Sequence, residues 1–172
     1  MKVFIKNIHF HPVLLFALGL MLCYNFSFAQ PILPQRTITV TATQAIHFGV
    51  FYVGNMGGTV ILNYDGSRTS TGDIALLPIT PIAQPAIFEI KLCQGRNVNI
   101  SIVPTITLTG SNGGTLTLDL GPTEKGDMYT PFPTGNDCNF ITTLRVGGTL
   151  YVPGSGISGS YSGSFSITFN QE

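Results

Sequence analysis

The segment Ser160–Phe169, SYSGSFSITF, alternates small hydroxyl side chains with aromatic and aliphatic ones. Successive side chains of a β-strand point to opposite faces, so this period of two predicts a strand with one buried and one wet face. A shift of register by one residue would put every aromatic ring into water, so the pattern specifies the register strongly. The residues predicted to face the core are Tyr161, Phe165, Ile167 and Phe169.

The same alternation recurs along the chain, and helical periodicity is nearly absent. It is found in segments 37–43, 59–63, 88–93, 97–102 and 115–120. Turn signals rich in glycine and asparagine separate these segments, as short connections between strands require. We therefore predict an all-β fold, an immunoglobulin-like or pilin-like antiparallel β-sandwich of about ten short strands.

Three Gly-Gly-Thr-apolar tetrapeptides occur, at Gly57–Val60, Gly113–Leu116 and Gly147–Leu150. We interpret them as hairpins in which two glycines turn the chain and threonine begins the next strand. The stretch Gly121–Asn136 carries turn formers and few apolar residues, which predicts a long surface loop.

Residues 1–29 have the features of a signal peptide. A positive start, Lys2 and Lys6, precedes an apolar run of roughly a dozen residues, too short for a comfortable membrane span. Small residues stand at the two positions that a signal peptidase reads before Gln30. Lipidation at Cys23 is the alternative, but the preceding Leu22 is bulky where a small residue is usual.

Residues 30–172 are then expected to form a single exported domain, in the periplasm, at the outer surface or outside the cell. No second apolar run of spanning length follows, so no transmembrane segment is expected after signal removal. Only 9% of the residues are charged, and the eight basic residues equal the acidic ones in number, with no basic cluster. This composition argues against nucleic acid as a partner.

Two cysteines, Cys93 and Cys138, remain after the predicted cleavage. In an oxidising compartment two such thiols pair more often than they stay free, which favours a disulfide. Two separate buried thiols are the alternative.

The sequence shows no recognisable catalytic, cofactor or metal site. His47 is the one histidine left after the predicted cleavage, and a single histidine with two distant cysteines does not make a triad or a zinc site. The acidic residues around the long loop could form a glycosidase pair or a calcium loop, but a solvated acidic loop fits their spacing better. These residues are Asp119, Glu124, Asp127 and Asp137. We therefore expect a protein that is not an enzyme and has no cofactor.

Tyr129 and Phe132, in the predicted loop, are the aromatic residues that could be exposed as a binding surface. The alternative is that both rings hold the loop onto the sandwich.

Five segments carry a resemblance to a known family: Ile46–Phe51, Gly57–Val60, Asp65–Arg68, Gly147–Leu150 and Gly159–Phe165. Together, and in this order, they resemble the secreted bacterial family called domain of unknown function 4402. That family has no assigned activity, so the resemblance implies a fold and export. A looser likeness, in the early Phe48-Gly49 and the final strand, links the chain to spore-coat-U proteins and archaic chaperone–usher pilins. The early cysteine of many pilins is missing.

Pilins assemble by donating an N-terminal strand to a neighbour. Ile38, Val40 and Ala42 form an apolar row that could serve in such strand exchange, with the first strand of its own fold as the alternative. The function expected is thus an exported structural or adhesive surface component, pairing with itself or another surface subunit. The alternative is an extracellular glycan- or protein-binding module without catalysis.

Overall fold

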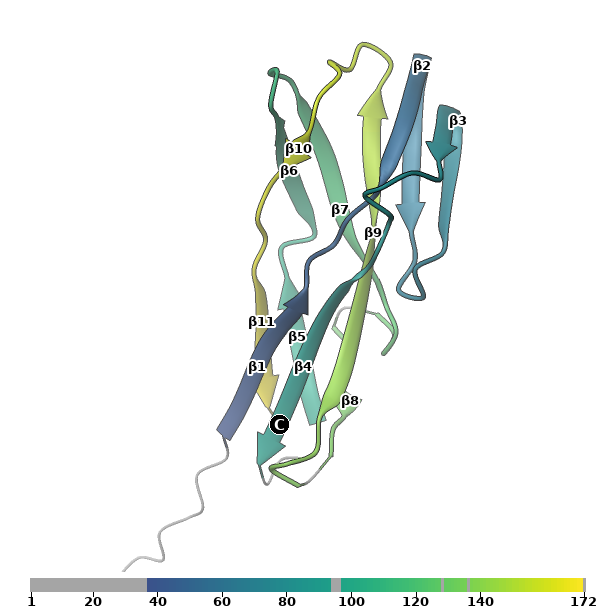
Figure 1. Ribbon diagram of the computed structural model, residues 1–172. Coiled ribbons are helices and arrows are strands. Elements are labelled where there is room, and N and C mark those ends of the chain that lie inside the picture. The colour runs from purple at the N-terminus through teal and green to yellow at the C-terminus, as the bar shows by residue number, and fades with distance from the viewer. Residues whose placement is uncertain (1–36, 94–96, 128, 136, 172) are drawn as a thin grey trace, which may run out of the picture. The chain divides into compact units, whose positions relative to one another are not determined.

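A computed structural model of the protein describes residues 37–93, 97–127, 129–135 and 137–171. The predicted signal peptide and Cys23 lie outside these residues. Within these residues the regular secondary structure consists of β-strands alone (Figure 1). The strands are β1 (Thr37–Gln44), β2 (Val50–Leu62), β3 (Arg68–Leu77), β4 (Ala86–Cys93), β5 (Asn97–Ile102), β6 (Thr105–Gly110), β7 (Thr115–Thr123), β8 (Phe132–Pro133), β9 (Thr142–Pro153), β10 (Tyr161–Ser162) and β11 (Ile167–Gln171).

The larger of two antiparallel sheets is organised around β9. Its order is β1-β4-β9-β7-β6-β10, and the β2–β3 hairpin adds to it through β9. One edge of β9 pairs with β7, at residues 146–151. The other edge pairs first with β4, at residues 142–146, and then with β2, at residues 148–153. Strand β9 therefore changes partner at Gly147, and the sheet curls around it.

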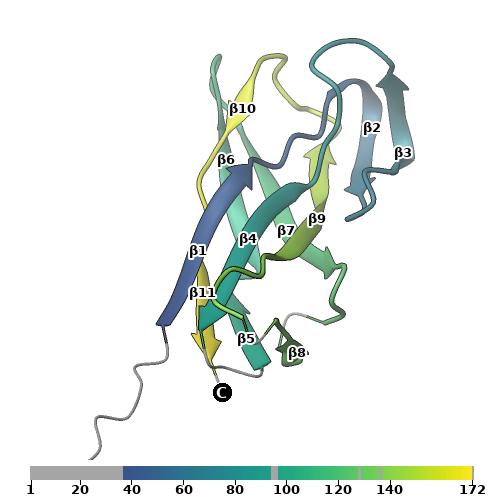
Figure 2. The ribbon, with the colours of Figure 1, turned by 60° about the horizontal axis from the view of Figure 1, so that its bottom comes forward.

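A smaller sheet, β11-β5-β8, completes the sandwich-like arrangement. Strands β5 and β6 are two parts of one bent stretch, separated by Val103 and Pro104. The final stretch bends with it, since β10 pairs with β6 in the larger sheet and β11 with β5 in the smaller one (Figure 2). The prediction of a single continuous last strand was wrong for this reason. Its alternation is confirmed, because the four apolar side chains all pack against the core.

The core consists of the inward residues of both sheets, as the period-two pattern predicts. Val60 of β2, Ile90 of β4, Val98 of β5 and Leu144 of β9 have no exposed surface. Phe88 of β4 meets the rings of Phe165 and Phe169 at centroid distances of 6.4 and 5.9 Å, which joins the larger sheet to the final stretch of the chain. The all-β, antiparallel, sandwich-like class is confirmed.

Shortening Ile90 tests how tightly this core is packed. Ile90→Val removes one buried methylene-sized group and should lower the free energy of unfolding by about 1 kcal/mol. Ile157→Val removes the same group from a side chain that is 48% exposed, and should change it by less than about 0.5 kcal/mol. Urea unfolding of both variants measures the difference. Equal effects would mean that the region around Ile90 is loosely packed.

Two of the three Gly-Gly-Thr segments are not hairpins. Gly113–Leu116 does connect β6 to β7, as predicted. The other two lie inside long strands, Gly57–Val60 in β2 and Gly147–Leu150 in β9, at opposite ends of the pairing between these strands. The glycines inside these strands allow a neighbouring backbone to approach closely, which is a common reason for glycine in a strand. A Cβ at Gly58 would collide with the Thr71 carbonyl, and one at Gly147 with the Leu62 carbonyl.

Candidate functional site

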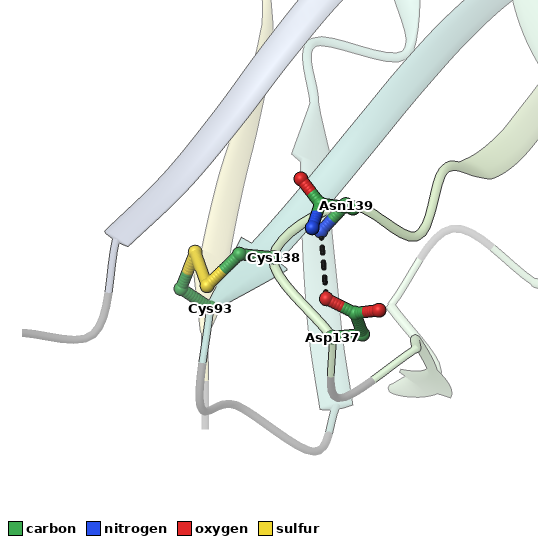
Figure 3. Close-up of a disulfide and its surroundings, with 4 residues drawn as sticks. All are labelled: Cys93, Asp137, Cys138 and Asn139. Atoms are coloured by element: carbon green, nitrogen blue, oxygen red, sulfur yellow. Dashed lines mark hydrogen bonds between the residues drawn. A yellow bond between two sulfur atoms is a disulfide. The ribbon is translucent and has the colours of Figure 1, made fainter.

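The disulfide predicted between Cys93 and Cys138 is confirmed. Cys93 ends β4, and Cys138 lies in the turn that precedes β9 (Figure 3). In the same turn the Asn139 backbone N–H donates to Asp137 Oδ1 over 3.0 Å. The cross-link therefore joins the end of β4 to the segment that leads into β9, its neighbour in the sheet.

His47 takes a structural position. Its Nδ1 accepts a hydrogen bond of 2.9 Å from the backbone N–H of Gly49, and its backbone exchanges two bonds of 2.8 Å with Gln84. These contacts hold the approach to β2, where Gly49 has a positive φ of 73°. The imidazole nitrogen that could act as a base is thus engaged by the backbone.

Several of the acidic side chains have a local partner. Asp119 Oδ1 accepts from Thr105 Oγ1 over 2.7 Å, and Glu124 forms an ion pair with Arg145 over 2.8 Å. The pKa of Asp65 lies below its ordinary value because the side chain and backbone of Ser67 donate to its carboxylate, in the turn between β2 and β3. Among the described residues no group of three or more histidine, cysteine or acidic side chains could hold a metal ion.

Of the two aromatic residues considered for a loop binding surface, Tyr129 is exposed and Phe132 is buried. Tyr129 is 63% exposed, in agreement with the prediction. Phe132 is only 3% exposed, so its assignment to an exposed binding surface was wrong. It forms the short strand β8 and pairs with Val98, which carries its ring into the core. The predicted loop is correspondingly shorter, since β7 continues to Thr123.

The apolar row Ile38, Val40 and Ala42 lies in β1, at the edge of the larger sheet. Its members stand opposite Leu92, Ile90 and Phe88 of β4, so they face inward. Ile38 and Val40 are half-buried against the core, whereas Ala42 is exposed. In the structure β1 thus serves as the first strand of its own fold, and its second edge has no partner strand within the residues described.

The outer face of β3, β2, β9, β7 and β6 is dominated by threonine. One row across the sheet reads Thr71, Thr59, Tyr151, Thr117 and Thr107, each residue directly opposite the next. Directly opposed residues of antiparallel strands share a face, with Cβ atoms about 5 Å apart. We call this surface the threonine face; it comprises Thr59, Ile61, Thr69, Thr71, Thr105, Thr107, Thr109, Thr115, Thr117, Asp119, Thr149 and Tyr151.

A shallow, open hollow of about 390 Å³ lies on this face beside Tyr151. Its lining is Gly58, Thr115, Thr117, Tyr151, Val152 and Pro153. Tyr151 is 44% exposed, in the middle of the threonine row. Two glycines of β2, Gly57 and Gly58, pair with Pro153 and Val152 of β9 at this end of the sheet.

The threonine face was not among the surfaces that sequence reasoning singled out. The alternation that predicted the strands also placed Thr115 and Thr117 on a wet face, and this was the available signal. Tyr151 was missed because its strand contains Gly147 and Gly148, which we interpreted as a turn. Once β9 is known to be continuous, Tyr151 alternates with the buried Leu150 and Val152 and must point outward.

Comparison with known proteins gives one match. Neither the curated proteins nor the solved structures include a significant match to this chain. Within the described residues, no helix is long and apolar enough to cross a membrane. The family model described as a domain of unknown function, DUF4402, matches residues 38–170, from β1 to β11. Since this match covers most of the chain, the protein belongs to the DUF4402 family.

Proposed function

We propose that this chain is an exported structural or adhesive surface component that assembles by strand pairing through β1. The observation that carries the proposal is the character of this edge strand. An edge strand presents unpaired N–H and C=O groups that another chain can bind, and proteins usually protect such edges with charges, proline or a bulge. The sequence of β1, TITVTATQ, contains neither a charged residue nor proline.

The geometry of β1 leaves most of this edge regular. The pairing with β4 is in uninterrupted register from Thr37 to Ala42, and its irregularity falls only between Ala42 and Gln44. Side-chain bonds hold this end, where Thr43 Oγ1 donates to the Ile87 carbonyl and Gln44 Nε2 to the Pro85 carbonyl. Residues 37–42 thus offer a straight edge of about 20 Å, long enough for a partner strand.

Of the other edge strands, β11 (ITFNQ) also lacks charge and proline but is shorter than β1, and the remaining edges are better protected. Strand β3 carries Arg68 and Asp73, and β8 has only two residues, one of them Pro133. Strand β10 is equally short. This contrast supports β1 as the edge that accepts a partner.

Two forms of assembly use this edge. In the first, β1 stays on β4 and pairs through its free edge with a strand of a second subunit. In the pilin-like form, β1 leaves β4 and fills the same position in a neighbour, with Ile38 and Val40 inserted into that core. In both forms Thr39 and Thr41 belong to the strand that meets the other subunit, with their side chains on the outer face of the sheet. The Cys93–Cys138 disulfide supports export, because disulfides persist in oxidising compartments.

Charges on the edge should abolish assembly. We expect the full-length chain, expressed for export in a bacterial host and concentrated after refolding, to form a ladder of oligomers by size-exclusion chromatography with light scattering. Thr39→Lys with Thr41→Lys should leave a monomer, because two ammonium groups would oppose a partner strand. The control is Thr115→Lys with Thr117→Lys, which places the same charges at exposed positions of β7, a strand paired on both edges.

The control variant should keep the ladder. A wild-type chain that stays monomeric at every concentration would contradict the proposal, as would oligomers that survive the β1 substitutions. A deletion of β1 is a poorer test, because it would expose Ile90 and Leu92 and destabilise the monomer itself. Equal loss of oligomers in both lysine variants would show that net charge, and not the β1 edge, controls association.

A further inference from the structure

We propose that the threonine face binds a neutral glycan chain, with Tyr151 as its stacking platform and the hollow beside it as the position of one sugar ring. This inference is independent of strand pairing, because the threonine face and the free edge of β1 share no residue. It assigns a binding site to the outer surface of β2, β7 and β9.

The shape of the site fits a sugar ring. Tyr151 stands on a sheet between two threonines, Thr59 and Thr117, whose short side chains leave one side of its ring open. An aromatic ring combines an apolar face, which packs on the C–H face of a sugar, with a hydroxyl that can hydrogen-bond. The hollow is shallow and open, so a sugar ring would rest on it with one face in solvent. The Pro153 ring at its border adds a second apolar surface.

The hydroxyl groups around the hollow are free to bind. On this face, Thr59 and Thr71 hydrogen-bond each other over 2.6 Å, and Thr105 donates to Asp119. By contrast, the hydroxyls of Thr115, Thr117 and Tyr151 have no hydrogen-bond partner within the described residues. A hydroxyl is both donor and acceptor, which matches the hydroxyls of a sugar. Elsewhere on the face, unpaired hydroxyls within the described residues are also found at Thr69, Thr107, Thr109 and Thr149, so groups able to bind surround the ring and extend across the sheet.

The lack of positive charge on the threonine face indicates which class of glycan it could bind. The threonine face contains no lysine or arginine, and its carboxylate, Asp119, already accepts a hydrogen bond from Thr105. An acidic polysaccharide would find no cation here to balance its charge. The flat array of threonine hydroxyls extends across five strands, so a chain of several sugars could lie across it. These features favour a neutral polysaccharide.

Affinity electrophoresis with soluble polysaccharides tests the proposal. The probes are laminarin, xyloglucan and galactomannan as neutral chains, with alginate and hyaluronan as acidic ones. We expect at least one neutral probe to retard the full-length chain and Tyr151→Ala to weaken that binding about tenfold, the effect of losing a central aromatic contact. Tyr151→Phe, which keeps the ring, should retain most of the affinity. Thr117→Lys, which fills the hollow, should abolish it.

The matched control is Tyr52→Ala, which removes a tyrosine that is 65% exposed but does not line the hollow. It should bind as the wild type does, and so should the Thr39→Lys, Thr41→Lys variant. The unfolding midpoint of each variant shows that a loss of binding is not a loss of fold. Absence of retardation by all neutral probes would overturn the proposal. Retardation by acidic probes alone, or binding unaffected by both Tyr151→Ala and Thr117→Lys, would also overturn it.

Discussion

Replacing both disulfide cysteines, by Cys93→Ser with Cys138→Ser, should lower the free energy of unfolding by about 4 kcal/mol. The bond closes a loop with a sequence separation of 45 residues. Without it the unfolded chain gains the freedom of that loop, while the folded chain keeps the pairing of β4 with β9. An effect of this size is a large share of the stability of a domain, which is about 5–15 kcal/mol.

Urea unfolding of the exported chain, with and without a reducing agent, measures this contribution. The reduced chain and the double serine variant should unfold at the same lower urea concentration, and reduction should not change the double variant further. A difference below about 1 kcal/mol between oxidised and reduced chains would contradict the expectation, since it would mean that the bond hardly restricts the unfolded state.

The faces of the strands were predictable from the sequence, but their partners were not. The alternation in Ser160–Phe169 is a local property, and its apolar residues do pack against the core. The chain bends between β10 and β11 because their partners, β6 and β5, are themselves separated by a bend at Pro104. That bend is more than fifty residues away in the sequence. Local periodicity carries no information about such a distant partner.

The candidate sites show the same limit. Phe132 lies among turn formers and acidic residues, so nothing in its neighbourhood indicates burial; Val98, its partner, is far away in the sequence. Cysteines are different, because their number alone restricts the pairing, and that prediction is confirmed. Tyr151 could be assigned to the outer face only after Gly147 and Gly148 were known to continue a strand.

The glycines of β9 therefore give the most direct test of why this topology forms. Gly147 occupies an outward position of the strand but is buried, because the chain leaving β2 crosses over it. A Cβ there would collide with the Leu62 carbonyl oxygen and approach the Asn63 carbonyl carbon to 3.0 Å and the Tyr64 nitrogen to 3.1 Å. All three atoms belong to the backbone, so no change of rotamer can relieve the contact.

Gly147→Ala should consequently lower the free energy of unfolding by about 3 kcal/mol, as expected when a methyl group is forced into a closed space. To relieve the contact, β2 must move away from β9 where their pairing begins, at Leu62 and Gly148. Gly156→Ala is the control, because it adds the same methyl group in an exposed turn after β9, with no atom nearer than 3.1 Å. Urea unfolding should separate the two variants clearly. If Gly147→Ala is as stable as Gly156→Ala, then β2 does not approach β9 this closely, and the exchange of β4 for β2 as partner of β9 must have another cause.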